Sequence, residues 1–486
     1  MFDDYSCDDF YDEAFRPDGT PREHYRRLVE LLSSFEPGEL ERRARMRDAT
    51  FRSRGVTFTV YDEGEPEGLE RTFPMDLLPR IIPAAEWDLI AAGLTQRVRA
   101  LNMFLDDLYD GERSAIRDGV VPEWLVLSSD GFRREAFGVP AVGGVRCLVA
   151  GIDLIRDHAG TYMVLEDNLR NPSGVSYVLE NRQVMTRLFP LVTAAHAIRP
   201  VDHYPRSLLR TLLSVAPPTA TDPRVVVLTP GIFNSAYFEH AFLAREMGVE
   251  LVEGRDLVVH EHIVWMRTVR GLRRVDVIYR RLDDEFLDPV GFHSESGIGV
   301  PGLLSAMREG TVTVVNAVGN GAADDKAIYP FVAKFIRHYL NEEPLLPTVT
   351  TYLPWEPDQL AHILDRLDRL VVKPVGGAGG YGLVMGPSAS AEQLERCRAA
   401  LVADPRGFIA QEVMQLSRLP TMTDDQVVGR HVDLRPFVLS RPDGIEVLPG
   451  GLTRVALRKG SLVVNSSQGG GSKDTWVMAD GIGGPA

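Results

Sequence analysis

The stretch KPVGGAGGYG, residues 373–382, decides between the fold classes that bind nucleotides. Its glycine spacing satisfies G-x-G-x-x-G, which is a weak signal by itself. A P-loop requires a lysine after the glycines, whereas Lys373 precedes them. A dinucleotide site requires a helix after the loop, but YGLVMG at 381–386 is typical of a strand. The loop is therefore predicted to join two antiparallel strands, over 370–375 and 381–386.

Two kinds of protein place such a glycine-rich flap over a nucleotide: protein kinases and ATP-grasp enzymes. A kinase also requires the motifs V-A-I-K, H-R-D and D-F-G, and the chain contains none of them. ATP-grasp enzymes carry a lysine on the strand that enters the flap, which is the position of Lys373. The alternative that stays open is a glycine-rich hairpin without a ligand.

Candidate metal ligands lie some two hundred residues before the flap. GIDLIRD at 151–157 and VLEDN at 164–168 indicate two strands joined by a short turn. Glu166 and Asn168 are two positions apart on a strand, so their side chains face the same way, and Asp153 lies on the preceding strand. Oxygen atoms of this kind are the ligands that Mg²⁺ prefers. The alternative is a solvated strand end.

Downstream, the chain resembles ATP-grasp carboxylate–amine ligases. The matching segments are DDK (324–326), IAQEV (409–413), VDLRPFVL (432–439), GGLTRVA (450–456) and NSSQGGGSKDTW (465–476). In the usual order of that fold, the metal-binding strands come after these segments, whereas here they come first. The chain therefore resembles a circularly permuted ATP-grasp core, as in a group of bacterial circularly permuted ATP-grasp proteins of type 2.

That resemblance is most specific at 228–257, 279–289 and 465–477. It extends to glutathionylspermidine synthase and, more distantly, to glutathione synthetase and ribosomal-protein glutamate ligases. It implies a mixed α/β or α+β fold in which a small Rossmann-like domain is inserted into the permuted core. The expected units are a helical and mixed region at 1–144, metal-binding strands at 145–200, a small α/β domain at 201–323 and a nucleotide-binding part at 324–486, with its flap at 373–386.

The resemblance also implies an ATP- and Mg²⁺-dependent ligase that acts through an acyl phosphate. The implied metal ligands are Asp153, Glu166 and Asn168. Phosphates and adenosine would contact Lys326, Lys373, Gly377, Gly379, Gly380, Gly382, Gln411 and Glu412. Catalytic contacts would come from Arg435, Arg454 and Asn465. Two alternatives remain: an ATP-binding partner protein that lacks turnover, and a phosphotransferase on the same fold.

The substrate side is predicted at the ends of strands in the small domain. Asn234 or Ser235 would cap a helix at 236–248 and receive an anion. Arg280 and Arg281 would hold a carboxylate, and Asp283 and Asp284 an amine; the alternative is an ion-pair cluster between domains. One departure is Gly151, which occupies a position where glutathionylspermidine synthase carries an arginine.

Composition limits the partners. The chain has 486 residues and a formal net charge of −15, which disfavours nucleic acid and anionic membranes and favours a cationic partner, although solubility alone also explains it. Three widely spaced cysteines and an acidic N-terminus without an apolar core lead us to expect a reduced, cytoplasmic protein. We also expect the strand after Arg454 to join the sheet of the metal strands, and 476–486 to run beside 145–151.

Overall fold

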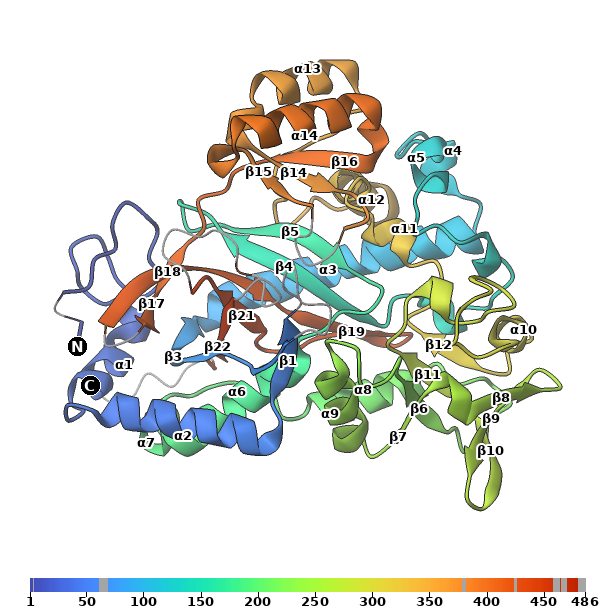
Figure 1. Cartoon of the computed structure of the whole chain (residues 1–486), viewed down its shortest axis with the longest axis horizontal. Helices are drawn as coiled ribbons and strands as arrows, with labels where there is room; N and C mark the ends of the chain where they lie inside the picture. Colours follow the sequence, from blue (N-terminus) through green and yellow to red (C-terminus); the bar gives the residue numbers. More distant parts are fainter. Residues whose placement is uncertain are drawn as a thin grey trace.

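The computed structural model describes residues 1–2, 4–60, 69–377, 382–423, 426–457, 464 and 470–479. Its largest sheet, in this described part, has nine strands in the order β20-β19-β4-β18-β21-β22-β3, with β5 paired to β4 and β17 paired to β18 (Figure 1). The bounds are β3 Met75–Ile82, β4 Val149–Arg156, β5 Tyr162–Asn168, β17 Arg418–Thr423, β18 Gln426–Arg435, β19 Phe437–Arg441, β20 Gly444–Val447, β21 Leu452–Val455 and β22 Gly471–Val477.

The sheet order confirms the permuted arrangement of the core. Strand β4, from the first third of the chain, lies between β18 and β19 from its last part. As expected, β21 belongs to the same sheet as β4 and β5. Of the segment 476–486 expected beside 145–151, only 476–479 are described, and for these the expectation was wrong. Trp476 and Val477 end strand β22, which pairs in parallel with β3, and β18 and β21 separate β22 from β4. Residues 480–486 lie outside the described residues.

Both faces of this sheet are buried. On β19, Val438 belongs to one apolar core, while its neighbours Phe437 and Leu439 belong to another, because successive side chains point to opposite faces. The first core includes the 26-residue helix α3 (Ala84–Tyr109). The second includes helix α6 (Val175–Leu188), which packs on β22. The hairpin β4–β5, which carries the predicted metal ligands, is thus fixed in the middle of the molecule (Figure 1).

A parallel sheet forms the small α/β unit, in the order β12-β11-β6-β7. The predicted β-α-β unit is confirmed by β6, α9 and β7, and the meander β8–β10 was not foreseen. The bounds are β6 Val225–Leu228, α9 Tyr237–Met247, β7 Glu250–Val252, β8 Leu257–His260, β9 Ile263–Thr268, β10 Gly271–Val275, β11 Val277–Arg280, α10 Leu303–Arg308 and β12 Thr313–Val315.

A separate lobe carries the flap, at the top of Figure 1. Its sheet has the order β13-β16-β14-β15, and β14 pairs antiparallel with β15, as predicted for a flap that joins two such strands. Helix α14 begins after Ser390, whose hydroxyl forms a capping box with Gln393. The bounds are β13 Thr351–Tyr352, α13 Pro357–Asp365, β14 Leu370–Pro374, β15 Val384–Met385, α14 Ala391–Ala403 and β16 Phe408–Glu412.

Shorter helices and a two-stranded ribbon complete the described chain. They are α1 Glu23–Ser33, α2 Glu39–Arg54, β1 Thr57–Val60, β2 Leu69–Thr72, α4 Ser114–Arg117, α5 Glu123–Leu127, α7 Pro190–Ala194, α8 Tyr204–Leu213, α11 Gly321–Asp324 and α12 Val332–Phe335. None of the helices in the described part of the chain combines the length and apolar character needed to cross a bilayer. The domain limits given above stay predictions.

Candidate active site

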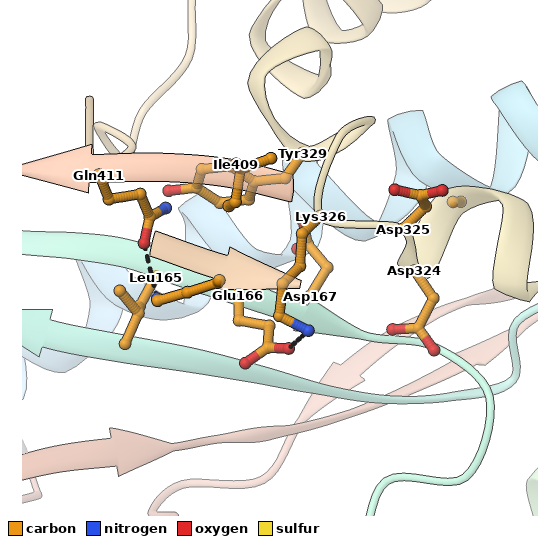
Figure 2. A pocket seen from close by; sticks show the side chains of 11 residues that line it. Leu165, Glu166, Asp167, Asp324, Asp325, Lys326, Tyr329, Ile409 and Gln411 are labelled. Atoms are coloured by element: carbon orange, nitrogen blue, oxygen red, sulfur yellow. Dashed lines mark hydrogen bonds and ion pairs between the residues drawn. The ribbon is translucent and has the colours of Figure 1, made fainter. Parts of the chain in front are cut away.

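A pocket lies where the hairpin β4–β5 meets the flap lobe (Figure 2). Strand β5 forms one wall, the segment after α11 another, and strands β14 and β16 the third. Its lining residues are Leu165, Glu166, Asp167, Ala323, Asp324, Asp325, Lys326, Tyr329, Lys373, Ile409 and Gln411. The structure therefore brings Glu166 and the two predicted lysines together from segments some two hundred residues apart.

Both lysines already have oxygen partners in the pocket. Lys326 Nζ lies 2.8 Å from Glu166 Oε1 and donates to the Gly377 carbonyl oxygen at 2.5 Å. Lys373 Nζ donates to Gln411 Oε1 at 2.6 Å. Burial lowers the pKa of Lys373 from its ordinary value to about 8, and the nearby charge of Lys326 acts in the same direction, against the carboxylate of Glu166. This ammonium group is poised to gain a phosphate oxygen as a partner.

The three predicted metal ligands share one face of the β4–β5 hairpin. Asp153 is directly opposite Glu166, and Gly151 is directly opposite Asn168, so pairing places these side chains on the same side. The amide nitrogen of Asn168 is buried and has no hydrogen-bond partner. Two carboxylates and the amide oxygen of Asn168 are oxygen donors of the kind that a hard cation such as Mg²⁺ takes, whereas the amide nitrogen cannot be a ligand. Among the described residues, no cluster of three or more His, Cys, Asp or Glu side chains forms an alternative metal site.

The two predicted phosphate arginines lie next to Asp153. Arg435 contacts it through Nε at 2.5 Å and Nη2 at 2.8 Å, and Arg454 Nη2 contacts it at 2.8 Å. Arg454 also pairs with Asp433 on the neighbouring strand, with Nε 2.9 Å from Oδ1. Burial alone would raise the pKa of Asp153, but the two guanidinium groups hold it well below its ordinary value.

The other residues predicted to contact the nucleotide differ in whether their side chains face the pocket. Gln411 faces the pocket, whereas the next side chain, Glu412, accepts hydrogen bonds from Tyr352 at 2.7 Å and Arg366 at 3.4 Å. Gly382 has a φ of +72°, a conformation that favours glycine, at the end of the flap. The predicted contacts Gly379, Gly380 and Asn465 lie outside the described residues.

On the substrate side, the predicted helix cap was wrong. Ala236 is the N-cap of α9 and no side chain caps it, because Asn234 Oδ1 accepts a hydrogen bond from the Ala236 backbone at 2.9 Å instead. Ser235 is exposed. The loop therefore starts the helix through its own turn, and its role in anion binding stays a prediction.

The predicted carboxylate and amine contacts have partners within the chain. Arg280 is buried; it donates to the carbonyl oxygens of Asn316 and Leu282 and pairs with Asp284 at 2.6 Å. These contacts favour the ion-pair alternative for Arg280 and Asp284, because they already satisfy the charges. Asp283 is exposed and accepts a hydrogen bond from Asn171 at 3.1 Å.

Arg281, another substrate candidate, contacts the loop that follows the hairpin β4–β5. Its Nη1 donates to the Pro172 carbonyl oxygen at 3.0 Å and its Nη2 to Ser173 Oγ at 2.5 Å, in the loop that follows β5. Glu239 accepts a third bond at 3.2 Å and also caps helix α6 through the backbone of Ser176 at 3.0 Å. Arg281 thus ties the small α/β unit to the hairpin, and contact with a substrate stays a prediction.

Three acidic residues of the site were missed by sequence reasoning. Asp433 pairs with Arg454, Asp324 lines the pocket and pairs with Arg170 at 2.6 Å, and Asp325 accepts from Arg406 at 2.7 Å. Asp433 and Asp324 stand in the segments VDLR and DDK, where only the basic residue was taken as functional. In both segments an acidic residue stands close to the basic one, and this pattern is the sequence signal that could have identified Asp433 and Asp324.

Local packing explains why position 151 is a glycine. A Cβ atom there would lie 2.9 Å from Cβ of Pro172, which is too close, and 3.4 Å from Cδ of Arg435, so a larger side chain would have to displace Pro172. Arg435 occupies the space instead. Two other arginines near the hairpin also have partners: Arg170 pairs with Asp324 of the pocket, and Arg156 pairs with Glu86 at 3.1 Å and lies over aromatic rings.

Comparisons with known proteins agree with this geometry. An uncharacterized protein of Synechocystis sp. is 54% identical over 98% of both chains. One of Mycobacterium tuberculosis is 51% identical over 99% of this chain and 86% of its own. A candidate glutamate–cysteine ligase of Frankia alni is 44% identical over 96% of this chain, which spans 54% of that protein.

Solved structures show the same fold. A glutathione synthetase-like effector of Globodera pallida superposes with a TM-score of 0.55 at 12% identity, covering 92% of this chain and 98% of its own. The relation to glutathionylspermidine synthase stays a prediction. The family model described as circularly permuted ATP-grasp type 2 matches residues 79–456, which include both strands with the predicted metal ligands, the flap and both arginines. The chain therefore belongs to the circularly permuted ATP-grasp type 2 family.

Proposed function

We propose that this protein is an ATP- and Mg²⁺-dependent ligase that joins a carboxylate to an amine through an acyl phosphate. The observation that carries the proposal is the meeting of Glu166, Lys326 and Lys373 in one pocket, with Asp153 directly across the hairpin from Glu166. Cations for phosphate and oxygen ligands for a metal lie side by side there, as phosphoryl transfer requires.

The first step of the proposed reaction is attack by a carboxylate oxygen of the substrate on the γ-phosphorus of ATP. The bond from that phosphorus to its bridging oxygen breaks, which leaves ADP and an acyl phosphate. The amine nitrogen then bonds to the acyl carbon, phosphate leaves, and the amine proton passes to solvent. Mg²⁺, when bound, neutralises phosphate charge; Asp153, Glu166 and Asn168 would hold it.

The chain's own cations would bind and orient the phosphates. Lys326 and Lys373 both line the pocket, from different segments of the chain, and can neutralise oxygens of a nucleotide bound there. Arg435 presents a planar donor fork that suits a transferred phosphoryl group. Gln411, next to Lys373, is the side chain we propose for contact with the base.

The substrates we propose are a small carboxylic acid, or the carboxyl group of a peptide, and an amine. The name of the Frankia relative, which describes a glutamate–cysteine ligase, supports this class, although this chain spans about half of that protein. The loop at 171–174, held by Arg281, borders the hairpin and is where we place the acid. All three cysteines are free and buried, which supports the reduced cytoplasmic environment that we propose.

The test is ADP release from Mg-ATP with panels of amino acids, short peptides and amines, each alone and in pairs. A ligase requires both an acid and an amine and yields a condensed product detectable by mass spectrometry. ADP release with one substrate and a phosphorylated product would instead identify a phosphotransferase. ATP binding without turnover in any mixture would identify a binding partner protein. Lys373→Gln should abolish turnover, whereas Lys334→Gln, at an exposed lysine outside the pocket, should not.

A further inference from the structure

Four charges, three of them buried, meet where β4, β18 and β21 lie side by side. Asp153 and Asp433 carry the negative charges, and Arg435 and Arg454 carry the positive ones. The charges balance, so Asp153 is fully compensated within the protein. Glu166, across the hairpin, is compensated in the same way by Lys326 at 2.8 Å. Both carboxylates expected to bind a metal therefore already hold cations.

The two arginines are not equivalent in this cluster. Arg454 is directly opposite Asp433 on the neighbouring strand, and its Nε lies 2.9 and 3.1 Å from the two Asp433 oxygens. A further short contact joins its Nη2 to the same carboxylate, while a single contact of 2.8 Å reaches Asp153. Arg454 would thus remain paired even without Asp153.

Arg435 depends on Asp153 alone for its charge compensation. Both of its contacts with a carboxylate within the described chain go to Asp153, and its remaining bond reaches the Ser173 carbonyl oxygen at 3.3 Å. Its side chain is 16% exposed, compared with 8% for Arg454, and it lies over Gly151, where no Cβ obstructs it. Because Asp153 is its only carboxylate partner among the described residues and Gly151 leaves space beside it, Arg435 can exchange this partner for another.

We propose that Asp433 is a positioning residue that anchors Arg454, so that Arg435 is the arginine that leaves Asp153 when Mg-ATP binds. Arg435 then turns to the phosphates, while Arg454 stays on the sheet between two carboxylates. A metal without nucleotide must displace Arg435 from Asp153, and ATP without metal must draw it from the same carboxylate. Metal and nucleotide are therefore expected to strengthen each other's binding. This inference rests on the proposed function only for the identity of the ligands.

The test begins with Mn²⁺, a spectroscopic substitute for Mg²⁺, titrated into the full chain without nucleotide and followed by electron paramagnetic resonance. Arg435→Gln should raise Mn²⁺ affinity about tenfold, because it removes the competing cation from Asp153. Asp433→Asn should lower Mn²⁺ affinity by a similar factor, because Arg454 then has only Asp153 as a partner. Asp433→Glu should restore part of it. Arg441→Gln, at a paired arginine on β19 away from Asp153, is the matched control and should change nothing.

Melting temperatures separate positioning from simple stabilisation. A lower melting temperature for Asp433→Asn with unchanged Mn²⁺ affinity would overturn the inference, because the carboxylate would then serve the fold alone. If the Asp433→Asn variant does not fold, Arg435→Gln still tests the inference. An unchanged Mn²⁺ affinity of Arg435→Gln would refute the competition between Arg435 and the metal for Asp153.

A crystal structure with Mg²⁺ and a non-hydrolysable ATP analogue gives the direct view. Arg454 is expected on Asp433, with Arg435 off Asp153; Arg435 retained on Asp153 would overturn the inference. If the Mn²⁺ affinities are as expected but no condensed product forms, the ligase activity is refuted. The exchange of partners by Arg435 would still hold.

Discussion

Raising the pH from 7 to 9 should weaken the binding of Mg-ATP, because it removes the charge of Lys373. The folded-state pKa of this lysine is about 8, below its ordinary value of 10.5, as a result of burial. The ammonium group is therefore about nine-tenths charged at pH 7 and about one-tenth charged at pH 9. If the phosphates require the charged form, the Kd should rise about tenfold for each pH unit above 8.

The same shift makes a prediction of opposite sign for stability. A lysine whose folded pKa is depressed destabilises the fold while it is charged, which is below pH 8. A difference of 2.5 units corresponds to about 3 kcal/mol, and this cost is relieved as the pH rises from about 8 to 10.5. Lys373→Gln removes the cost at neutral pH and should raise the free energy of unfolding there, even though it weakens ATP binding.

The assay is calorimetric titration of Mg-ATP at half-unit steps from pH 7 to 9.5, with urea unfolding at the same pH values. Lys373→Arg keeps its charge throughout and should flatten the affinity profile, whereas Lys373→Gln should bind weakly at every pH. A Lys373→Gln variant that kept the wild-type affinity and its pH dependence would refute this account. The titrating group would then be another residue.

Three further changes probe the other parts of the structure. Glu166→Gln removes the carboxylate opposite Asp153 and should weaken Mn²⁺ binding at least tenfold in the presence of ATP, measured by electron paramagnetic resonance; an unchanged affinity would place the metal elsewhere. Arg80→Met leaves the buried Glu13 without its partner at 2.7 Å and should lower the free energy of unfolding by about 3 to 5 kcal/mol in urea; a loss below about 1 kcal/mol would contradict this. Cutting the chain in the segment 216–223 should give two fragments that bind Mg-ATP only when mixed, and calorimetry showing tight binding by the second fragment alone would contradict the divided site.

The sequence predicted most reliably what depends on local spacing. The antiparallel flap strands, the capping box at Ser390 and the hairpin that carries Glu166 all follow from short patterns of strand, turn and cap residues. The position of the metal strands within the sheet followed from motif order, because a permuted core must rebuild the same neighbours.

Long-range pairing could not be predicted in this way. Strand β3, MDLLPRII, has no alternation of apolar and polar residues and contains a proline, so it does not look like a strand. It forms because the register with β22 shifts between Asp76 and Arg80, which accommodates Pro79, and because Glu13 compensates the buried Arg80. Local sequence patterns do not indicate such partners, because they lie far apart in the sequence.

The same limit applies to individual site residues. Adjacent arginines at 280 and 281 look equivalent in the sequence, but the first is satisfied by backbone carbonyls and the second ties two structural units together. The anchoring of Arg454 by Asp433 depends on the pairing of two strands, and no spacing rule contains that contact.

The central position of β4 has a consequence for synthesis on the ribosome. All eight residues of β4 are buried, and its partners β18 and β19 are encoded far later, with Gln426 emerging some 270 residues after Arg156. At about 5 to 20 residues per second, translation leaves the apolar hairpin β4–β5 without those neighbours for roughly 15 to 50 s. During this time its backbone hydrogen-bonding groups and both faces of β4 are open to other chains. The nascent polypeptide should therefore be a client of ribosome-associated chaperones, and synonymous codon changes that slow translation between the two segments should lower the yield of folded protein.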